Sequence, residues 1–235
     1  MDCETVVCWF RDPANWSGPN GIPIRLLEHG YMSLLSVGIA ALIALPIGLL
    51  IGHTGRGAFL AISIGNLGRA IPSFAILAIA LPITLGLGLG LGFWPTVIAL
   101  VFLAIPPILT NTYVGVAGVD GDTLEAARGM GMTEGQVLRR IELPLAAPLV
   151  VAGLRTAAVQ VVATATLAAL VAWGGLGRYI VDGFATGRND RILGGAVLVA
   201  ALAILTEVAF AALERLVSPR TVSHPRRSPP SFSPL

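Results

Sequence analysis

The chain has 235 residues, of which 55% are hydrophobic and only 12% are charged, and its mean hydropathy is +0.82. Globular domains carry about 25% charged residues, so this composition excludes an ordinary soluble domain and indicates a membrane protein. The fifteen Lys and Arg residues are all arginines, which excludes lysine chemistry such as a P-loop or a Schiff base, and a net charge of +2 without a basic patch argues against a nucleic-acid partner.

The first thirty residues are more polar than the rest of the chain. Charges within the first twelve positions and the lack of an apolar core there argue against a cleavable signal peptide. Trp9, Phe10 and Trp16 suit anchoring at a membrane interface. Cys3 and Cys8 have neither C-x-x-C nor zinc-site spacing, so we expect two idle thiols, with a disulfide as the alternative if this end faces an oxidising compartment.

Apolar runs long enough to cross a bilayer follow this segment. A bilayer core needs about 20 mostly apolar residues of helix. Five such runs are predicted as transmembrane helices, at residues 31–52, 70–87, 94–116, 147–172 and 192–213. A shorter apolar piece at 58–67 is interpreted as part of a helix-turn entry to the second run. The sequence therefore predicts an all-α, polytopic membrane protein with five spans.

The distribution of arginines predicts the orientation, because positive residues favour the cytoplasmic side. With the C-terminus inside, the cytoplasmic set is Arg56, Arg69, Arg128, Arg139, Arg140, Arg215, Arg220, Arg226 and Arg227, against Arg11, Arg25, Arg178, Arg188 and Arg191 outside. We therefore expect the N-terminus outside and the C-terminus inside. The expected division is an extracytoplasmic segment at 1–30, a transmembrane domain at 31–214 with a cytoplasmic loop at 118–146, and a disordered cytoplasmic tail at 215–235.

Prolines interrupt the apolar runs. Each proline removes a helical hydrogen bond and favours a kink or a break that lines a cavity, as a translocation pathway needs. These residues are Pro46, Pro72, Pro82, Pro106 and Pro107.

The loop at 118–146 contains two predicted helix starts. Asp122 can cap a helix with Glu125 at the third position, and Thr133 can do so with Gln136, so each pair fits a capping box. The loop is therefore expected to form two short helices lying against the membrane.

Glycines between these two helices and a proline after the second one predict where the chain turns and where the second helix ends. Gly129 and Gly131 can turn the chain where other residues resist, and Pro144 is expected to end the second helix before the next span. An ordinary amphipathic connector, held to the bilayer by its apolar side chains, is the alternative interpretation.

A specific pattern in this loop resembles the EAA signature of permease subunits of bacterial ABC importers. Its positions are filled by Glu125, Ala126, Ala127, Gly131, Ile141, Leu143 and Pro144. The resemblance implies a type I importer permease fold like that of the methionine-importer permease. It also implies that the loop docks into a cleft of a cytoplasmic ATPase dimer, beside a second permease copy or paralogue, with an extracytoplasmic binding protein delivering substrate. The chain itself would be no enzyme, would hold no metal or cofactor, and would lie in the bacterial inner membrane.

Further stretches are similar to permeases of the glycine betaine, carnitine, choline and proline betaine group. They include the segments at 70–73, 105–113, 174–177 and 192–195. This resemblance implies a quaternary-amine osmoprotectant as substrate, with another small solute such as an amino acid as the alternative. Candidate pathway residues on these segments are Pro72, Ser73, Asn111 and Tyr113. Relatives often carry Arg at the position of Thr110, so a role of that charge is not expected here.

Two other functional classes fit the sequence less well. Asp120-Gly121 upstream of Ala127-Arg128 suggests a CDP-alcohol phosphotransferase, but the gap is too long and the next aspartate is Asp182, so the metal ligands are missing. A secondary transporter is disfavoured because inverted repeats are not apparent and five spans divide poorly.

Two ionisable residues fall well inside the predicted spans. Arg155 and Glu207 each lie seven residues, or roughly 10 Å, from the cytoplasmic surface of their helices. Because isolated charges are costly in a membrane, we expect the two to pair and to brace the fourth and fifth spans. Separate snorkelling of each side chain towards the headgroups is the alternative.

Overall fold

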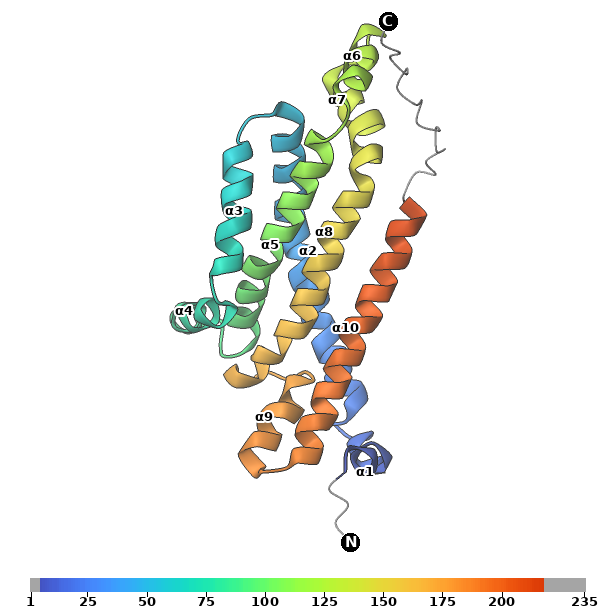
Figure 1. Cartoon of the computed structure of the whole chain (residues 1–235). Coiled ribbons are helices and arrows are strands. Elements are labelled where there is room, and N and C mark those ends of the chain that lie inside the picture. Colours follow the sequence, from blue (N-terminus) through green and yellow to red (C-terminus); the bar gives the residue numbers. More distant parts are fainter. Residues whose placement is uncertain (1–4, 218–235) are drawn as a thin grey trace, which may run out of the picture.

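The computed structural model describes residues 5–217, without the side chains of residues 60, 62, 67 and 69. Within that part of the chain the fold is entirely helical (Figure 1), as expected. The elements are α1 (Val6–Arg11), η1 (Pro13–Asn15), α2 (Ile22–Thr54), α3 (Ala58–Ala70), α4 (Ser73–Gly86), α5 (Phe93–Ala117), α6 (Gly121–Gly129), α7 (Glu134–Val137), η2 (Leu138–Glu142), α8 (Leu143–Thr164), η3 (Ala165–Val171), α9 (Gly177–Thr186) and α10 (Asn189–Val217).

Helix α5 forms the centre of the bundle and contacts α2, α3, α4 and α8. Leu100, Ala104 and Ile108 are buried along it and pack with Ala40 of α2 and Ala157 of α8. Small residues let these helices approach closely. Because lipid provides no hydrophobic driving force between helices, such close van der Waals packing holds a membrane bundle together.

Four helices are long and apolar enough to cross a membrane: α2, α5, the continuous helix Glu134–Val171 and α10. The first begins at Ile22, earlier than expected, so residues counted as part of the outer segment belong to this helix. Helix α10 lies at the edge of the bundle and packs on α8, α9 and α1. No residue in its most apolar window is buried, so that surface faces lipid or another protein.

The span predicted at 70–87 is a shorter helix in the structure, α4 with 14 residues, which Ile71 and Pro72 separate from the 13-residue helix α3. Pro72 lacks an N–H and disfavours helical geometry at the residue before it, so the helix ends there. In Figure 1, α3 lies lengthwise against α5 whereas α4 is seen almost end-on, so the chain turns sharply at this proline. Residues 58–67 belong to α3, which packs on α5 and leads through this turn into α4, as the predicted helix-turn entry requires.

The expected helix end at Pro144 is wrong. Helix α7 continues through the π-helix η2 into α8 without a break. The wider π-turn gives room for the proline ring and its missing N–H, so the helix passes the proline without ending. The loop is consequently joined to a span by one rigid helix.

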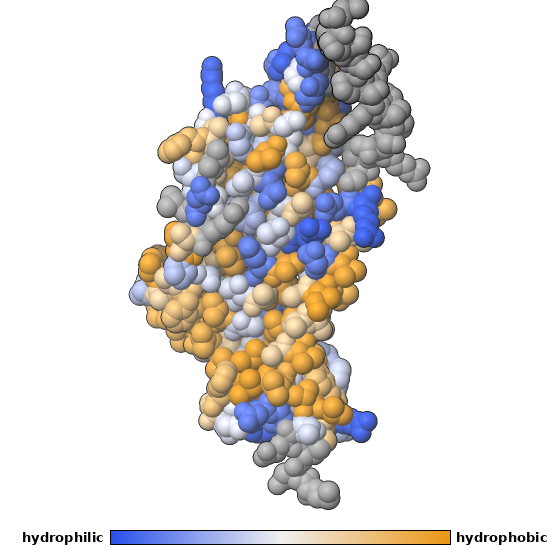
Figure 2. Space-filling model, viewed as in Figure 1, coloured by the Kyte–Doolittle hydropathy of each residue, from blue (hydrophilic) through white to orange (hydrophobic). Residues whose placement is uncertain are grey.

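The two ends of the bundle are polar. Figure 2 shows hydrophilic residues over the projecting α6–α7 region and at the opposite end, with apolar residues over α4 and the lower half of the bundle between them. Cys8 is disulfide-bonded, so the expectation of idle thiols is wrong and the alternative holds. The expected disordered tail falls almost wholly outside the described residues.

Candidate functional site: the coupling loop and the adjoining cavity

Helices α6 and α7 form a compact hairpin that projects beyond the ends of α3, α5 and α10 (Figure 1). Asp122 is the predicted cap of α6, but the structure shows that Asp120 caps this helix instead. The carboxylate of Asp120 accepts hydrogen bonds from the Thr123 N–H at 3.0 Å and the Thr123 hydroxyl at 3.1 Å. The predicted capping box of Thr133 and Gln136 at the start of α7 is confirmed. The hairpin therefore has well-defined ends.

Gly131 makes the turn between the two short helices. Its φ of +85° is a left-handed conformation that favours glycine. The N–H of Met132 donates to the carbonyl of Ala127 at 3.2 Å, which closes the turn. Ala127 is buried beneath it, while Glu125 and Ala126 are exposed, and Met130 is 77% exposed at the tip. The hairpin thus presents a small, mixed surface away from the bundle.

The remaining residues of the EAA pattern lie on the continuous helix. Leu143 and Pro144 are exposed, and Ile141 is half-buried. All seven positions of the pattern therefore belong to one unit formed by the hairpin and the first turns of the helix that follows it.

The base of the hairpin contains a polar network that no sequence pattern predicts. His53, in the last turn of α2, places Nδ1 2.6 Å from Oε2 of Glu142 and Nε2 3.5 Å from Oε2 of Glu134. Glu134 in turn accepts hydrogen bonds from Nε and a terminal nitrogen of Arg128 at 3.0 and 3.2 Å. This pairing raises the pKa of the Arg128 guanidinium, which stays charged. No local pattern could have revealed a contact across 89 residues.

A cavity of about 670 Å³ opens between α3, α4, α5 and α8. Pro72, Ser73 and Asn111, three of the four candidate pathway residues, line it together with Pro106 and Pro107, which the sequence marks as possible cavity-lining breaks. The other lining residues are Gly68, Ile71, Leu103, Thr156 and Gln160. The break at Pro72 creates this space, because an unbroken helix would continue past it.

Tyr113, the fourth candidate, is not among the lining residues. Its backbone carbonyl lies on the side of α5 that faces Gly52 of α2. Thr110 contacts Gly65 of α3, and its buried hydroxyl has no hydrogen-bond partner within the described part of the chain.

The chemistry of the cavity is neutral. Its polar groups are hydroxyls and amides, and none of the residues lining it carries a charge or an aromatic ring. Asn111 donates a hydrogen bond of 2.8 Å to the carbonyl of Pro107, so its amide is held in place. The lining residues therefore offer no aromatic face for a cation–π contact with a ligand.

Arg155 lies between α8 and α10, as the sequence suggested. Its Nε is 3.5 Å from Oε1 of Glu207. A terminal guanidinium nitrogen donates a 2.8 Å hydrogen bond to Glu214, which lies about two helical turns further along α10. The three side chains form one cluster with two carboxylates for one guanidinium.

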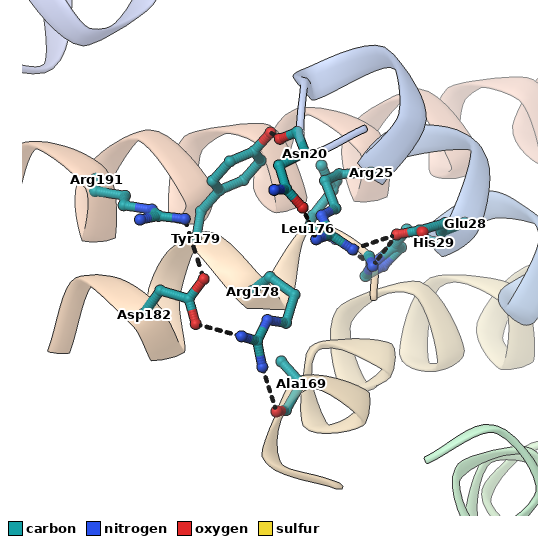
Figure 3. Close-up of polar contacts among 11 residues, drawn as sticks. Asn20, Arg25, Glu28, His29, Ala169, Leu176, Arg178, Tyr179, Asp182 and Arg191 are labelled. Carbon is teal, nitrogen blue, oxygen red and sulfur yellow. Dashed lines mark hydrogen bonds and ion pairs between the residues drawn. The ribbon is translucent and has the colours of Figure 1, made fainter. Parts of the chain in front are cut away.

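A second polar cluster ties the opposite end of the bundle together (Figure 3). Glu28 of α2 accepts a hydrogen bond from the N–H of Gly175 at 2.7 Å. His29 accepts one from the N–H of Leu176 at Nδ1, at 3.3 Å, and its Nε2 lies 2.8 Å from the carbonyl of Val162. A histidine that accepts at one nitrogen and donates at the other is neutral, so His29 bridges α2, α8 and the α9 loop without carrying charge.

The glycine-rich segment at 174–177 is explained by this contact. A Cβ at Gly174 would overlap the carboxylate of Glu28, and Gly175 adopts a φ of +83° beside His29. In Figure 3, Arg178 and Arg191 both point toward Asp182. Close packing against α2 and the positive φ of Gly175 therefore explain the glycines at 174 and 175.

The phosphotransferase alternative finds no support in this geometry. Asp120 caps α6, whereas Asp182 pairs with arginines at the other end of the bundle, so the two cannot share a metal. Among residues 5–217, no group of three or more potential metal ligands comes together.

Comparison with known families identifies the fold and its general role. Residues 44–223 match the model of the binding-protein-dependent transport system inner membrane component. The glycine betaine/carnitine/choline transport system permease protein OpuCB of Bacillus subtilis is 40% identical over 82% of this chain and 87% of its own length. The carnitine transport permease protein OpuCB of Listeria monocytogenes is 37% identical over 95% of this chain and 98% of its own length.

Solved structures agree with this result. The MetNI methionine ABC transporter in an inward-facing conformation matches with a TM-score of 0.72 and 26% identity, over 82% of this chain and 94% of that one. An amino acid ABC transporter crystallised with histidines has the same fold, with a TM-score of 0.67 and 19% identity over 92% and 98% of the two chains. The expected importer type I permease fold is confirmed, and so is the expectation of a multi-pass inner-membrane transport subunit whose ATPase is a separate chain. This chain belongs to the family of binding-protein-dependent transport system inner membrane components.

Proposed function

We propose that this permease carries a small quaternary-amine osmoprotectant: glycine betaine, carnitine, choline or proline betaine. The observation that carries the proposal is the identity of 37% to 41% with permeases named for glycine betaine, carnitine and choline, over at least 82% of this chain. The uncharged cavity beside Pro72, Ser73 and Asn111 is its pathway, and its neutrality suits solutes that are zwitterionic or singly charged. Selectivity then resides mainly in the binding protein.

Transport is driven through the hairpin of α6 and α7. Its exposed Glu125, Ala126 and Met130 surface docks on the cytoplasmic ATPase dimer, and the continuous helix Glu134–Val171 carries the movement to the cavity. Thr156 and Gln160, on that same helix, line the cavity. Closure of the ATPases on ATP therefore changes the pathway directly.

The complete membrane unit contains two permeases, this chain with a second copy or a paralogue. Four long helices each cross the membrane once, and α3 and α4 together make one further crossing. Neither α3 nor α4 alone reaches the roughly 20 residues that a single crossing needs. The N-terminus lies outside. The disulfide at Cys8 supports this orientation, because disulfides persist in oxidising compartments. Residues 1–30, 31–214 and 215–235 remain the proposed extracytoplasmic, transmembrane and cytoplasmic segments.

The substrate proposal is tested by measuring the affinity of the cognate binding protein for a panel of quaternary amines and amino acids, followed by uptake in cells with and without this permease. Binding and permease-dependent uptake of a quaternary amine are expected. Uptake of an amino acid such as methionine in preference to every quaternary amine would replace the proposal with the alternative solute class.

A further inference from the structure

The contact between His53 and Glu142 is the most buried side-chain contact at the base of the hairpin. Glu142 is 2% exposed and His53 is 14% exposed at the side chain. A buried carboxylate needs a partner, and His53 is the one side chain in the described part of the chain that hydrogen-bonds Glu142. This contact is therefore more than a surface ion pair.

The contact joins two elements that are far apart in the sequence. His53 ends α2, which also packs closely on α5: a Cβ at neighbouring Gly52 would meet the side chain of Val116 at 2.6 Å. Glu142 ends the π-helix η2, between α7 and α8. The second ring nitrogen of His53 faces Glu134 in the first turn of α7, and Glu134 holds Arg128 of α6. One imidazole is thus connected to every element of the hairpin.

We propose that His53 is a positioning residue for ATP-driven transport, which fastens the coupling hairpin to α2 so that α2, α5 and α8 move together. The inference rests on the proposed docking of the hairpin on the ATPase. Without this contact, the hairpin is attached to the bundle by the short connection from α5 and by the continuous helix into α8, and no hydrogen bond within residues 5–217 ties it to α2. The hairpin could then pivot on α8 when the ATPases close, and ATP would be hydrolysed with less movement of α2.

The experiment uses the complete transporter, assembled from this permease, its partner permease, the ATPase and the binding protein, in liposomes. ATP hydrolysed and solute accumulated are measured together, with an equimolar mixture of radiolabelled glycine betaine, carnitine and choline as the probe. Their ratio does not depend on how much transporter is present, so a merely less stable protein does not change it.

The matched variants are His53→Leu, which removes the donor, and His53→Asn, whose amide nitrogen can take the place of Nδ1. We expect His53→Leu to raise the ATP hydrolysed per solute by about fivefold or more, the low end of coupling between sites. His53→Asn should stay close to the wild-type ratio. His53→Gln, whose amide reaches the position of Nε2 instead, is a polar second variant in case the leucine does not assemble, and should also raise the ratio.

A wild-type ratio in His53→Leu and His53→Gln would overturn the inference, as would equal uncoupling by Asn and Leu. Glu142→Leu should also raise the ratio, and the double variant should be no worse than His53→Leu, which already removes the contacts to both Glu142 and Glu134. The Glu125→Lys variant separates this inference from the proposed function. If Glu125→Lys no longer binds the ATPase while the His53 variants keep the wild-type ratio, the inference about His53 is wrong and the proposed docking stands. If Glu125→Lys still binds the ATPase and transports solute, the proposed docking itself is wrong.

Discussion

Arg155 of α8 donates a 2.8 Å hydrogen bond to Glu214 of α10 while its Nε remains 3.5 Å from Glu207, so one guanidinium serves two carboxylates seven residues apart on the same helix. Helix α10 has few buried side chains to hold it in place. This cluster is therefore a specific link between α10 and the rest of the bundle.

Removal of the guanidinium should be more harmful than removal of either carboxylate. Arg155→Gln leaves two carboxylates without their shared cation and should lower stability by about 1–3 kcal/mol, whereas Glu207→Gln leaves the hydrogen-bonded pair in place and should cost about 1 kcal/mol or less. Thermal unfolding of the purified permease in detergent measures both. Losses that simply add in the Arg155→Gln/Glu214→Gln double variant would show that the two side chains do not interact.

His29 should contribute to stability through its two hydrogen bonds and not through charge. His29→Leu leaves the carbonyl of Val162 and the N–H of Leu176 without their side-chain partner, which should cost about 2 kcal/mol at about 1 kcal/mol for each bond. The exposed neighbour Tyr31 supplies the control, since Tyr31→Phe should have little effect. An unchanged unfolding temperature for His29→Leu would contradict the bridging role.

The turn of the hairpin offers a matched pair of glycines. Gly129 and Gly131 both have open space where a Cβ would lie, but only Gly131 has a positive φ, at +85°. Gly131→Val should therefore cost about 1–3 kcal/mol of local strain and reduce ATPase co-purification and transport, while Gly129→Val should do much less. Co-purification with the ATPase from detergent extracts measures the difference. Equal behaviour of the two variants would mean that the shape of the turn does not matter for docking.

The orientation can be measured with two single cysteines in a background where Cys3 and Cys8 are replaced by serine. Ser17→Cys, on the exposed segment before α2, should react with an impermeant thiol reagent in intact cells. Met130→Cys, at the tip of the hairpin, should react only after the membrane is permeabilised, because we place that end in the cytoplasm. The reverse pattern would overturn the proposed orientation.

The features that could be predicted from the sequence are those encoded locally. The Thr133 and Gln136 capping box is a pattern of four residues, and the structure contains it. The sequence predicts the cap of α6 two residues too late, because Asp120 and Asp122 are both good caps. Which of the two aspartates caps α6 depends on where the chain leaves α5, and the sequence around them does not fix that point.

The features that could not be predicted depend on contacts between distant segments. His53 and Glu142 are 89 residues apart, and nothing in either neighbourhood marks the other. The sequence marks Pro72 as a possible helix break, but the cavity is also lined by Thr156 and Gln160, which α8 brings to the same place. Hydropathy likewise predicts a span at 70–87, but it does not reveal that the chain turns sharply at Pro72, where this run begins.

The π-turn at Leu138–Glu142 has a consequence for the rotational phase of the long helix. A π-turn absorbs one extra residue, so the helix faces before and after it keep the alignment of an α-helix that is one residue shorter. Deleting Arg139 would let this turn become α-helical and should leave the hairpin aligned with α8. Deleting one residue in the middle of α8 would instead rotate everything beyond it by about 100°, since an α-helix has 3.6 residues per turn. The hairpin should therefore tolerate a change of length at this one turn and nowhere else along the helix that carries it.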